Sequence, residues 1–104
     1  MTEQDHDTYT TMEISKLKIF IDQLLKMLCL TQSHLQRDEL LDFLSFLRQF
    51  KTKLNKVLVS KIEVPVLFED EINSFLHHCD VPANYNITLA RLIKRRLYEL
   101  YNAL

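Results

Sequence analysis

The sequence predicts an all-α protein, a compact bundle of about five helices, and three observations support this prediction. The 104 residues include no glycine and only two prolines. Tight hairpin turns and phosphate-binding loops favour glycine, because glycine adopts positive φ without strain. Apolar residues make up 47% of the chain, a normal globular share, and many recur every three or four residues. This length suits one domain, which we expect over residues 12–104.

The N-terminal part of the chain divides into a tail and a helix. The first eleven residues are polar and show no periodicity, so we expect a disordered tail over residues 1–11. A first helix is expected over residues 12–30, where apolar side chains recur at helical spacing. The stripe consists of Ile14, Leu17, Phe20, Ile21, Leu24 and Leu28.

Two further helices are expected in the middle of the chain. Ser33 can cap the second helix, which we expect to end near Phe50. Asp38 and Glu39 lie near its start, where the helix dipole favours acids. Thr52 is expected to cap a short third helix.

The last two helices are predicted from a proline and a cap. Residues 60–64 are interpreted as a connection, and Pro65 is expected in the first turn of a fourth helix, because proline lacks the N–H that a helix start leaves unbonded. This helix is expected to end near Cys79. After a turn-rich loop over residues 80–86, Asn86 is a candidate cap for the last helix. The inner stripe of that helix is Leu89, Ile93, Leu97, Leu100 and Leu104.

Candidate catalytic and metal-binding groups do not form a recognisable site. The only cluster of possible ligands is His77, His78, Cys79 and Asp80. Neighbouring residues on a helix diverge by roughly 100°, whereas a zinc site needs ligands that converge. The acids at 69–71 also fan around a helix start, a common position for acids. We therefore expect no catalytic residue, no metal and no cofactor, and a protein that is not an enzyme.

Composition also bounds the compartment and the partners. The two cysteines are too few for a disulfide framework, and we find neither a signal peptide nor an apolar stretch long enough to span a membrane. We expect an intracellular, reducing compartment and no membrane partner. The formal net charge of −1 predicts no strong overall attraction to nucleic acid, although basic residues gather at 48–61 and 91–96.

Two predicted loops carry apolar side chains. Such side chains either form a groove for a short partner motif or close the ends of the core, and the sequence leaves both interpretations open. The residues are Leu30 and Leu35 in the first loop, and Cys79, Val81 and Tyr85 in the last.

The second half of the chain contains a pattern of short stretches. They are Thr52-Lys53-Leu54, Val59-Ser60-Lys61-Ile62, Ile72, Phe75-Leu76-His77-His78, Leu89-Ala90-Arg91-Leu92-Ile93-Lys94-Arg95 and Leu100. This pattern, with the expected order of helix lengths, resembles the N-terminal domain of transcription elongation factor TFIIS and the related integrase-binding domain of lens-epithelium-derived growth factor. The resemblance covers about residues 14–104. Glu63 stands where the family usually has glycine, and Arg96 or Leu97 where it usually has tryptophan.

The resemblance implies a nuclear scaffold module of the transcription-elongation machinery. Such modules bind short disordered motifs that carry an apolar or aromatic anchor and an acidic flank. The positions that would take the anchor are Leu30, Thr31, Leu35, Cys79, Val81 and Tyr85. Arg91 and Lys94, or Lys51, would contact the acids. We expect a monomer and micromolar affinity, because a motif that folds on binding loses conformational entropy.

Two alternatives come from other functional classes. The first is a small nucleic-acid-binding bundle that uses the basic residues at 48–61 and 91–96, with binding that falls steeply with salt. The second is an assembly or oligomerisation subunit. It requires a large apolar patch left outside the closed bundle, for which Phe46 and Ile19 are candidates.

Overall fold

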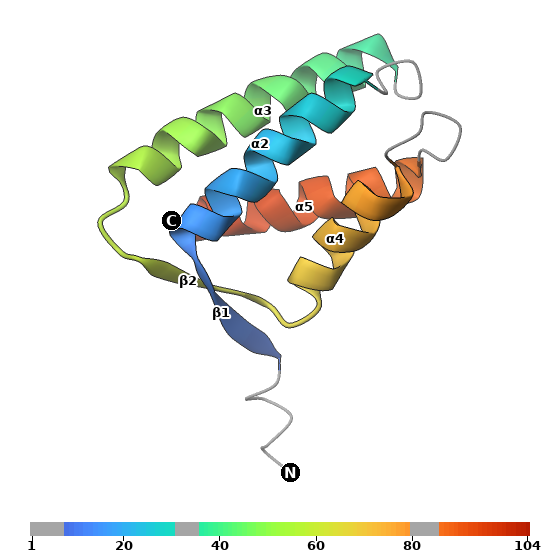
Figure 1. Ribbon diagram of the computed structural model, residues 1–104. Helices are drawn as coiled ribbons and strands as arrows, with labels where there is room; N and C mark the ends of the chain where they lie inside the picture. The colour runs from blue at the N-terminus through green and yellow to red at the C-terminus, as the bar shows by residue number, and fades with distance from the viewer. Residues whose placement is uncertain (1–7, 31–35, 80–85) are drawn as a thin grey trace.

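The computed structural model describes residues 8–30, 36–79 and 86–104, and these form a mostly helical domain with a two-stranded antiparallel sheet (Figure 1). The elements are β1 (Tyr9–Glu13), α2 (Ile14–Leu30), α3 (Arg37–Lys56), β2 (Lys61–Pro65), α4 (Phe68–His78) and α5 (Ile87–Ala103). The described part of the chain thus has four helices where about five were expected, together with a sheet that was not predicted. None of its helices has both the length and the apolar character that crossing a membrane requires.

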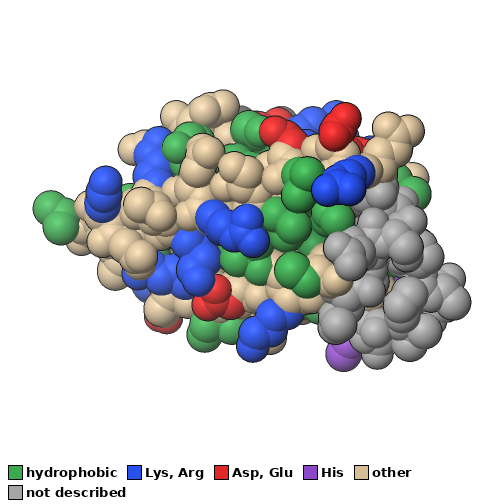
Figure 2. Space-filling view, turned by 90° about the horizontal axis from the view of Figure 1, so that it is seen from above, with side chains coloured by type: hydrophobic (Ala, Val, Ile, Leu, Met, Phe, Trp, Pro, Cys, Tyr) green, Lys and Arg blue, Asp and Glu red, His purple; other side chains and the backbone are tan. Residues whose placement is uncertain are grey.

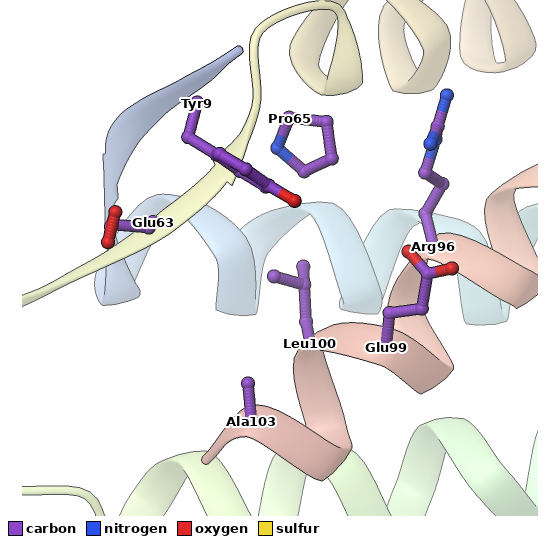
Figure 3. Close-up of a pocket in the computed structure, with 7 residues that line it drawn as sticks. All are labelled: Tyr9, Glu63, Pro65, Arg96, Glu99, Leu100 and Ala103. Carbon is purple, nitrogen blue, oxygen red and sulfur yellow. The ribbon is translucent and has the colours of Figure 1, made fainter. Parts of the chain in front are cut away.

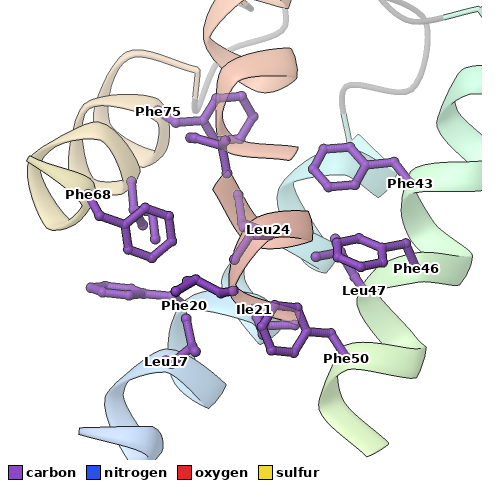
Figure 4. Packing of buried hydrophobic residues seen from close by; sticks show 14 of the residues in the cluster. Leu17, Phe20, Ile21, Leu24, Phe43, Phe46, Leu47, Phe50, Phe68 and Phe75 are labelled. Carbon is purple, nitrogen blue, oxygen red and sulfur yellow. The ribbon is translucent and has the colours of Figure 1, made fainter. Parts of the chain in front are cut away.

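Helix α2 runs through the middle of the core. Its predicted stripe is confirmed, because Leu17, Ile21 and Leu24 are completely buried. Figure 4 shows these side chains between the phenylalanines of α3 and those of α4. The helix begins at Ile14, two residues later than expected, because Met12 and Glu13 belong to β1.

The second and third predicted helices are one continuous helix, α3. The prediction was wrong at Thr52, whose hydroxyl does not cap a new helix but donates to the Arg48 carbonyl at 3.1 Å, within the same helix. Phe50 and Leu54 are both buried and continue one apolar face across the expected break. The cap residue is Gln36, whose side chain makes no capping bond, and Ser33 lies outside the described residues.

Strands β1 and β2 correct two further predictions. Tyr9 lies opposite Pro65 and Glu13 opposite Lys61, so residues 9–11 form a strand where a disordered tail was expected. Residues 60–64, interpreted as a connection, largely form β2. The side chains of Met12, Ile62 and Val64 point inward and are buried. Their burial holds the two-stranded sheet on the helices. Residues 1–7 of the expected tail lie outside the described part.

Helix α4 begins later than predicted, and α5 begins as predicted. Pro65 ends β2 instead of starting the helix, and α4 begins at Phe68. The predicted end near Cys79 is confirmed. The Asn86 side-chain oxygen accepts a hydrogen bond from the Leu89 N–H at 3.0 Å, which confirms it as the α5 cap.

The four helices close one core. Helix α2 contacts α3 and α4, and α5 packs against α4. Helix α5 also meets α3 through aromatic rings, because Phe46 stacks on Tyr98 and Phe50 meets Tyr101 edge to face. The rings are therefore used within the chain. Phe46, a candidate for an exposed apolar patch, is buried, whereas Ile19 is exposed.

Candidate interaction groove beside the two-stranded sheet

Half of the eight predicted partner-binding residues fall outside the part of the chain that the structure describes. Thr31, Leu35, Val81 and Tyr85 lie outside the described residues, and Leu30 is the last residue of α2, with its side chain undescribed. Their assignment stays a prediction.

Cys79 is not available to a partner. It is completely buried, and its Sγ accepts a hydrogen bond from the Asn86 N–H at 3.3 Å. This contact joins the end of α4 to the start of α5. The expectation that Cys79 is exposed to take an apolar anchor is corrected: its thiol is part of the packing where the two helices meet.

Arg91 and Lys94 are on the surface, but acids of α3 already contact them. Arg91 Nε and Nη2 donate to the two Glu39 carboxylate oxygens at 2.8 and 3.1 Å. Lys94 Nζ donates to Asp42 at 2.9 Å. The hydrogen bonds from Arg91, with its positive charge, hold the pKa of Glu39 below its ordinary value, against the opposing effect of desolvation. These pairs connect α5 to α3.

Three further basic residues also make contacts between helices. Arg96 donates from Nε and Nη2 to the Glu71 carboxylate of α4, both at 3.1 Å, and these bonds raise the Arg96 pKa. Lys51 pairs with Asp22 of α2. Lys53 donates to the Tyr101 carbonyl at 2.9 Å, with its ammonium 4.2 Å from the ring centre. The basic blocks of the sequence are therefore not one basic face.

Neither cluster of titratable residues at the ends of α4 converges on a point. The rings of His77 and His78 are 6.5 Å apart between centroids, and both side chains are exposed. Glu69 pairs with Lys16, whereas Glu71 pairs with Arg96, so these acids face different helices. Among the described residues no three His, Cys, Asp or Glu side chains gather where they could hold a metal ion.

One edge of β2 has no partner among the described residues. Ile14 N–H donates to the Ser60 carbonyl at 2.8 Å, and Val66 N–H to the Thr8 carbonyl at 3.3 Å. Hydrogen-bonded pairs alternate along an antiparallel ladder, so the backbone groups of Lys61, Glu63 and Pro65 point away from β1. No described residue bonds to them. Such an edge is a template for another strand.

A shallow groove runs beside this edge, between the two-stranded sheet and α5. Its central part has a volume of about 260 Å³, and in Figure 3 Leu100 and Ala103 point from α5 toward Tyr9 and Pro65. Two adjoining hollows extend this groove along the sheet. The lining of the three hollows is Thr8, Tyr9, Val57, Val59, Ile62, Glu63, Pro65, Val66, Leu67, Arg96, Glu99, Leu100, Ala103 and Leu104. Most of this lining is apolar.

Exposed apolar residues lie at both ends of β2. Leu58, in the link from α3 to β2, is 100% exposed, and Val59 beside it is exposed as well. Val66 and Leu67, immediately after β2, are also exposed. Figure 2 shows hydrophobic atoms protruding beside Lys and Arg side chains at the end where this link lies. A set of this kind is typical of interaction surfaces.

Three lysines lie around the link. Lys56 precedes it and Lys61 follows it, and Lys18 of α2 lines a hollow of about 420 Å³ together with Val57, Val59 and Lys61. None of the three forms an ion pair within the described ranges. These residues were not predicted as a site from the sequence. The signal that could have found them is the strict polar–apolar alternation of Lys-Ile-Glu-Val at 61–64, typical of a half-buried strand.

Comparisons with known proteins identify no relative. No protein-family model, no curated protein and no solved structure matches the chain. The resemblance to the TFIIS N-terminal domain stays a prediction from sequence.

Proposed function

We propose that this chain is a protein-interaction module, which acts by binding and not by catalysis. The observation that carries the proposal is the unpaired edge of β2 beside a groove with an apolar lining. An extended segment added to such an edge gains backbone hydrogen bonds, and neighbouring hollows select its side chains. The partner is a short disordered protein segment.

The chemistry of the lining supports a partner with an apolar or aromatic anchor and an acidic flank. Val59, Leu100 and Ala103 offer apolar contact to the anchor. Lys18, Lys56 and Lys61 surround the same end, and none of them forms an ion pair within the described ranges, although Glu13 lies opposite Lys61 in the sheet. Opposite charges across an interface speed encounter and fix its register.

The resemblance to transcription-elongation scaffolds leads us to propose a nuclear role and partners among elongation factors. That family's loops correspond to Leu30–Leu35 and Cys79–Tyr85, which are mostly outside the described residues. The edge of β2 is a different place, at the opposite end of the helices. We propose it as the primary site because an open backbone edge and a groove with a mostly apolar lining lie side by side there.

The nucleic-acid alternative has less support. Arg91, Lys94 and Arg96 each contact a carboxylate, and displacing that carboxylate would offset much of the gain from a phosphate. Lys18 and Lys61, which form no ion pair within the described ranges, line a hollow together with Val57 and Val59. A short DNA duplex is therefore expected to bind weakly, with a small salt slope.

A peptide-display selection tests the proposed function. Short segments from disordered regions of nuclear proteins are selected on the wild-type chain, and the affinities of the winners are measured by fluorescence anisotropy. We expect winners with an apolar anchor beside acids and micromolar affinity. Val59→Asp should weaken binding at least about tenfold, by placing a charge in the apolar lining.

A matched control separates the groove from general surface effects. Ile19→Asp makes the same kind of change at an exposed apolar residue of α2, which does not line the groove. It should leave the affinity unchanged. Equal affinities of the wild type and Val59→Asp would remove the groove as the site.

A further inference from the structure

The open edge of β2 has a sequence that is complementary to itself. We propose that this edge pairs antiparallel with the same edge of a second copy of the chain, so that Lys61 lies opposite the partner's Glu63 and the two small sheets join into one four-stranded sheet. This inference rests on the proposed function, because it names an occupant of the same edge. It differs from the monomer expected from the sequence.

The direction of the backbone groups limits the possible registers. Only residues whose N–H and C=O point outward can form the hydrogen-bonded pairs, and on β2 these are Lys61, Glu63 and Pro65. A two-fold axis must therefore pass opposite one of residues 61 to 65. These five registers can be compared by the charges that they bring together and by the N–H that proline lacks.

The register centred on Ile62 is favoured on both counts. It places Lys61 opposite the partner's Glu63, and by symmetry Glu63 opposite the partner's Lys61. Each such pair can exchange two backbone hydrogen bonds and brings opposite charges together on the exposed face. Proline is not required to donate anywhere in the central part of this ladder.

The other registers are disfavoured by like charges or by a lost donor. Centring on Lys61 or on Glu63 places two like charges directly opposite each other, which is destabilising. Centring on Val64 places Glu63 opposite the partner's Pro65 on both sides, and centring on Pro65 places the two prolines opposite each other. Proline has no N–H to donate, so both registers lose hydrogen bonds. The sequence of β2 thus specifies one alignment.

The exposed apolar residues fit the same alignment. With Ile62 on the axis, the link before β2 of one copy lies toward the turn that follows β2 of the other, so Leu58 and Val59 come toward the partner's Val66 and Leu67. Leu58, Val66 and Leu67 are among the exposed large hydrophobic residues of the described chain. One alignment therefore covers apolar residues at both ends of β2, and matches the charges between them.

The charges on β1 extend the complementarity across the whole sheet. Glu13 lies opposite Lys61 within one chain, and Thr11 opposite Glu63. The exposed face of the joined sheet would then carry a row of Glu13, Lys61, the partner's Glu63 and the partner's Thr11. No two like charges are neighbours in this row. Pro65 ends the hydrogen-bonded part of the edge. The two-fold contact uses the same β2 edge in both copies, so neither β2 edge is left open to a third copy.

Light scattering coupled to gel filtration, with sedimentation equilibrium, tests the proposal on the full chain. The wild type should show a concentration-dependent dimer. Glu63→Lys places like charges at both symmetric positions and should raise the dimer dissociation constant at least about tenfold. Glu63→Gln removes the attraction without adding repulsion and should have a smaller effect. Glu63 is exposed, and circular dichroism will show that each variant is folded.

Mixing two variants tests the register itself. Lys61→Glu and Glu63→Lys should each be largely monomeric alone, and should form a heterodimer when mixed, because every cross-pair then has opposite charges. A wild type that stays monomeric up to about 1 mM overturns the proposal. A Glu63→Lys chain that dimerises as well as the wild type, or a mixture that forms no heterodimer, overturns it too.

The two proposals fail in different ways. A monomer that binds the selected peptides, with the binding lost in Val59→Asp, would overturn self-pairing and leave the peptide function standing. A dimer with the predicted charge dependence, for which no peptide is selected, would overturn the peptide function and leave self-pairing standing. The selected peptides, if both hold, should dissociate the dimer.

Discussion

The ring of Phe46 on α3 lies parallel to the ring of Tyr98 on α5, with 4.0 Å between centroids and 10° between planes. Tyr101 meets the Phe46 ring at a steep angle from the next turn of α5. Phe46 is buried, whereas Tyr98 is partly exposed, so Tyr98 covers the ring from the solvent side. The seam between α3 and α5 is thus aromatic in its centre and ionic toward the loops.

Removing the outer ring of this stack should destabilise the domain. We expect Tyr98→Ala to lower the free energy of unfolding by about 1–2 kcal/mol, because the stack and the cover over Phe46 are both lost. Tyr98→Phe keeps the ring and should stay within about 0.5 kcal/mol of the wild type. Urea unfolding followed by circular dichroism measures both. Equal stability of Tyr98→Ala and the wild type would contradict the stack's role.

Stability should depend on pH through Glu39. Its pKa is lower in the folded chain than its ordinary value of 4.5, so the folded state binds this proton less readily than the unfolded state. The Arg91 contact therefore contributes fully above pH 4.5 and is lost as pH falls through the folded pKa. The pair is partly exposed, so we expect less than about 1 kcal/mol.

Glu39→Gln provides the comparison for that prediction. The stability difference between the wild type and Glu39→Gln should be largest near neutral pH and low salt, and should shrink as the solution is acidified below 4.5. Thermal unfolding across a pH series measures it. A difference that grows on acidification would contradict the assigned sign.

A proline at residue 53 distinguishes one continuous α3 from two capped helices. In the continuous helix, Lys53→Pro should cost about 3 kcal/mol, since it removes a backbone donor and clashes with the preceding turn. In a short helix capped by Thr52, residue 53 would be the first helical position, where proline is tolerated. Lys53→Ala is the control, because it removes only the side-chain contacts with Tyr101. The free energies of unfolding of Lys53→Pro and Lys53→Ala, measured with a chemical denaturant, should differ by most of the cost of the proline.

Proline substitutions at two neighbouring residues can test which backbone N–H groups of β1 face β2. The Thr10 N–H points toward Val64 of β2, whereas the Thr11 N–H points outward. Thr10→Pro should therefore lose a ladder bond and lower the unfolding temperature more than Thr11→Pro does. A disordered tail would tolerate both equally. Scanning calorimetry gives the order, and a larger effect of Thr11→Pro would contradict the register.

Much of the fold could be predicted from local signals. The stripe of Leu17, Ile21 and Leu24 fixes the buried face of α2, because helical spacing alone decides which side chains share a face. Asn86 was found as a cap for the same reason, since capping depends on residues three positions apart. Thr52 misled because threonine caps helices and also bonds backward within them.

The pairing of β1 with β2 and the ion pairs between helices could not be predicted from local signals. Tyr9 and Pro65 meet across two intervening helices, and no spacing rule relates residues so far apart in sequence. The Arg91–Glu39 contact has the same character, because it depends on how two finished helices are placed. The candidate groove is formed by residues of β1, β2 and α5, which are far apart in the sequence. These residues were therefore not predicted as one site.

The distance in sequence between β1 and β2 has a consequence for biosynthesis. Helices α2 and α3 lie between the two strands, so β1 leaves the ribosome long before the residues that pair with it. Loop closure over such a span is slow compared with helix formation, so the two helices should form before the ladder. The two-stranded sheet then closes around a preformed helical pair, and the outer edge of β2 becomes ordered only when the ladder with β1 has formed.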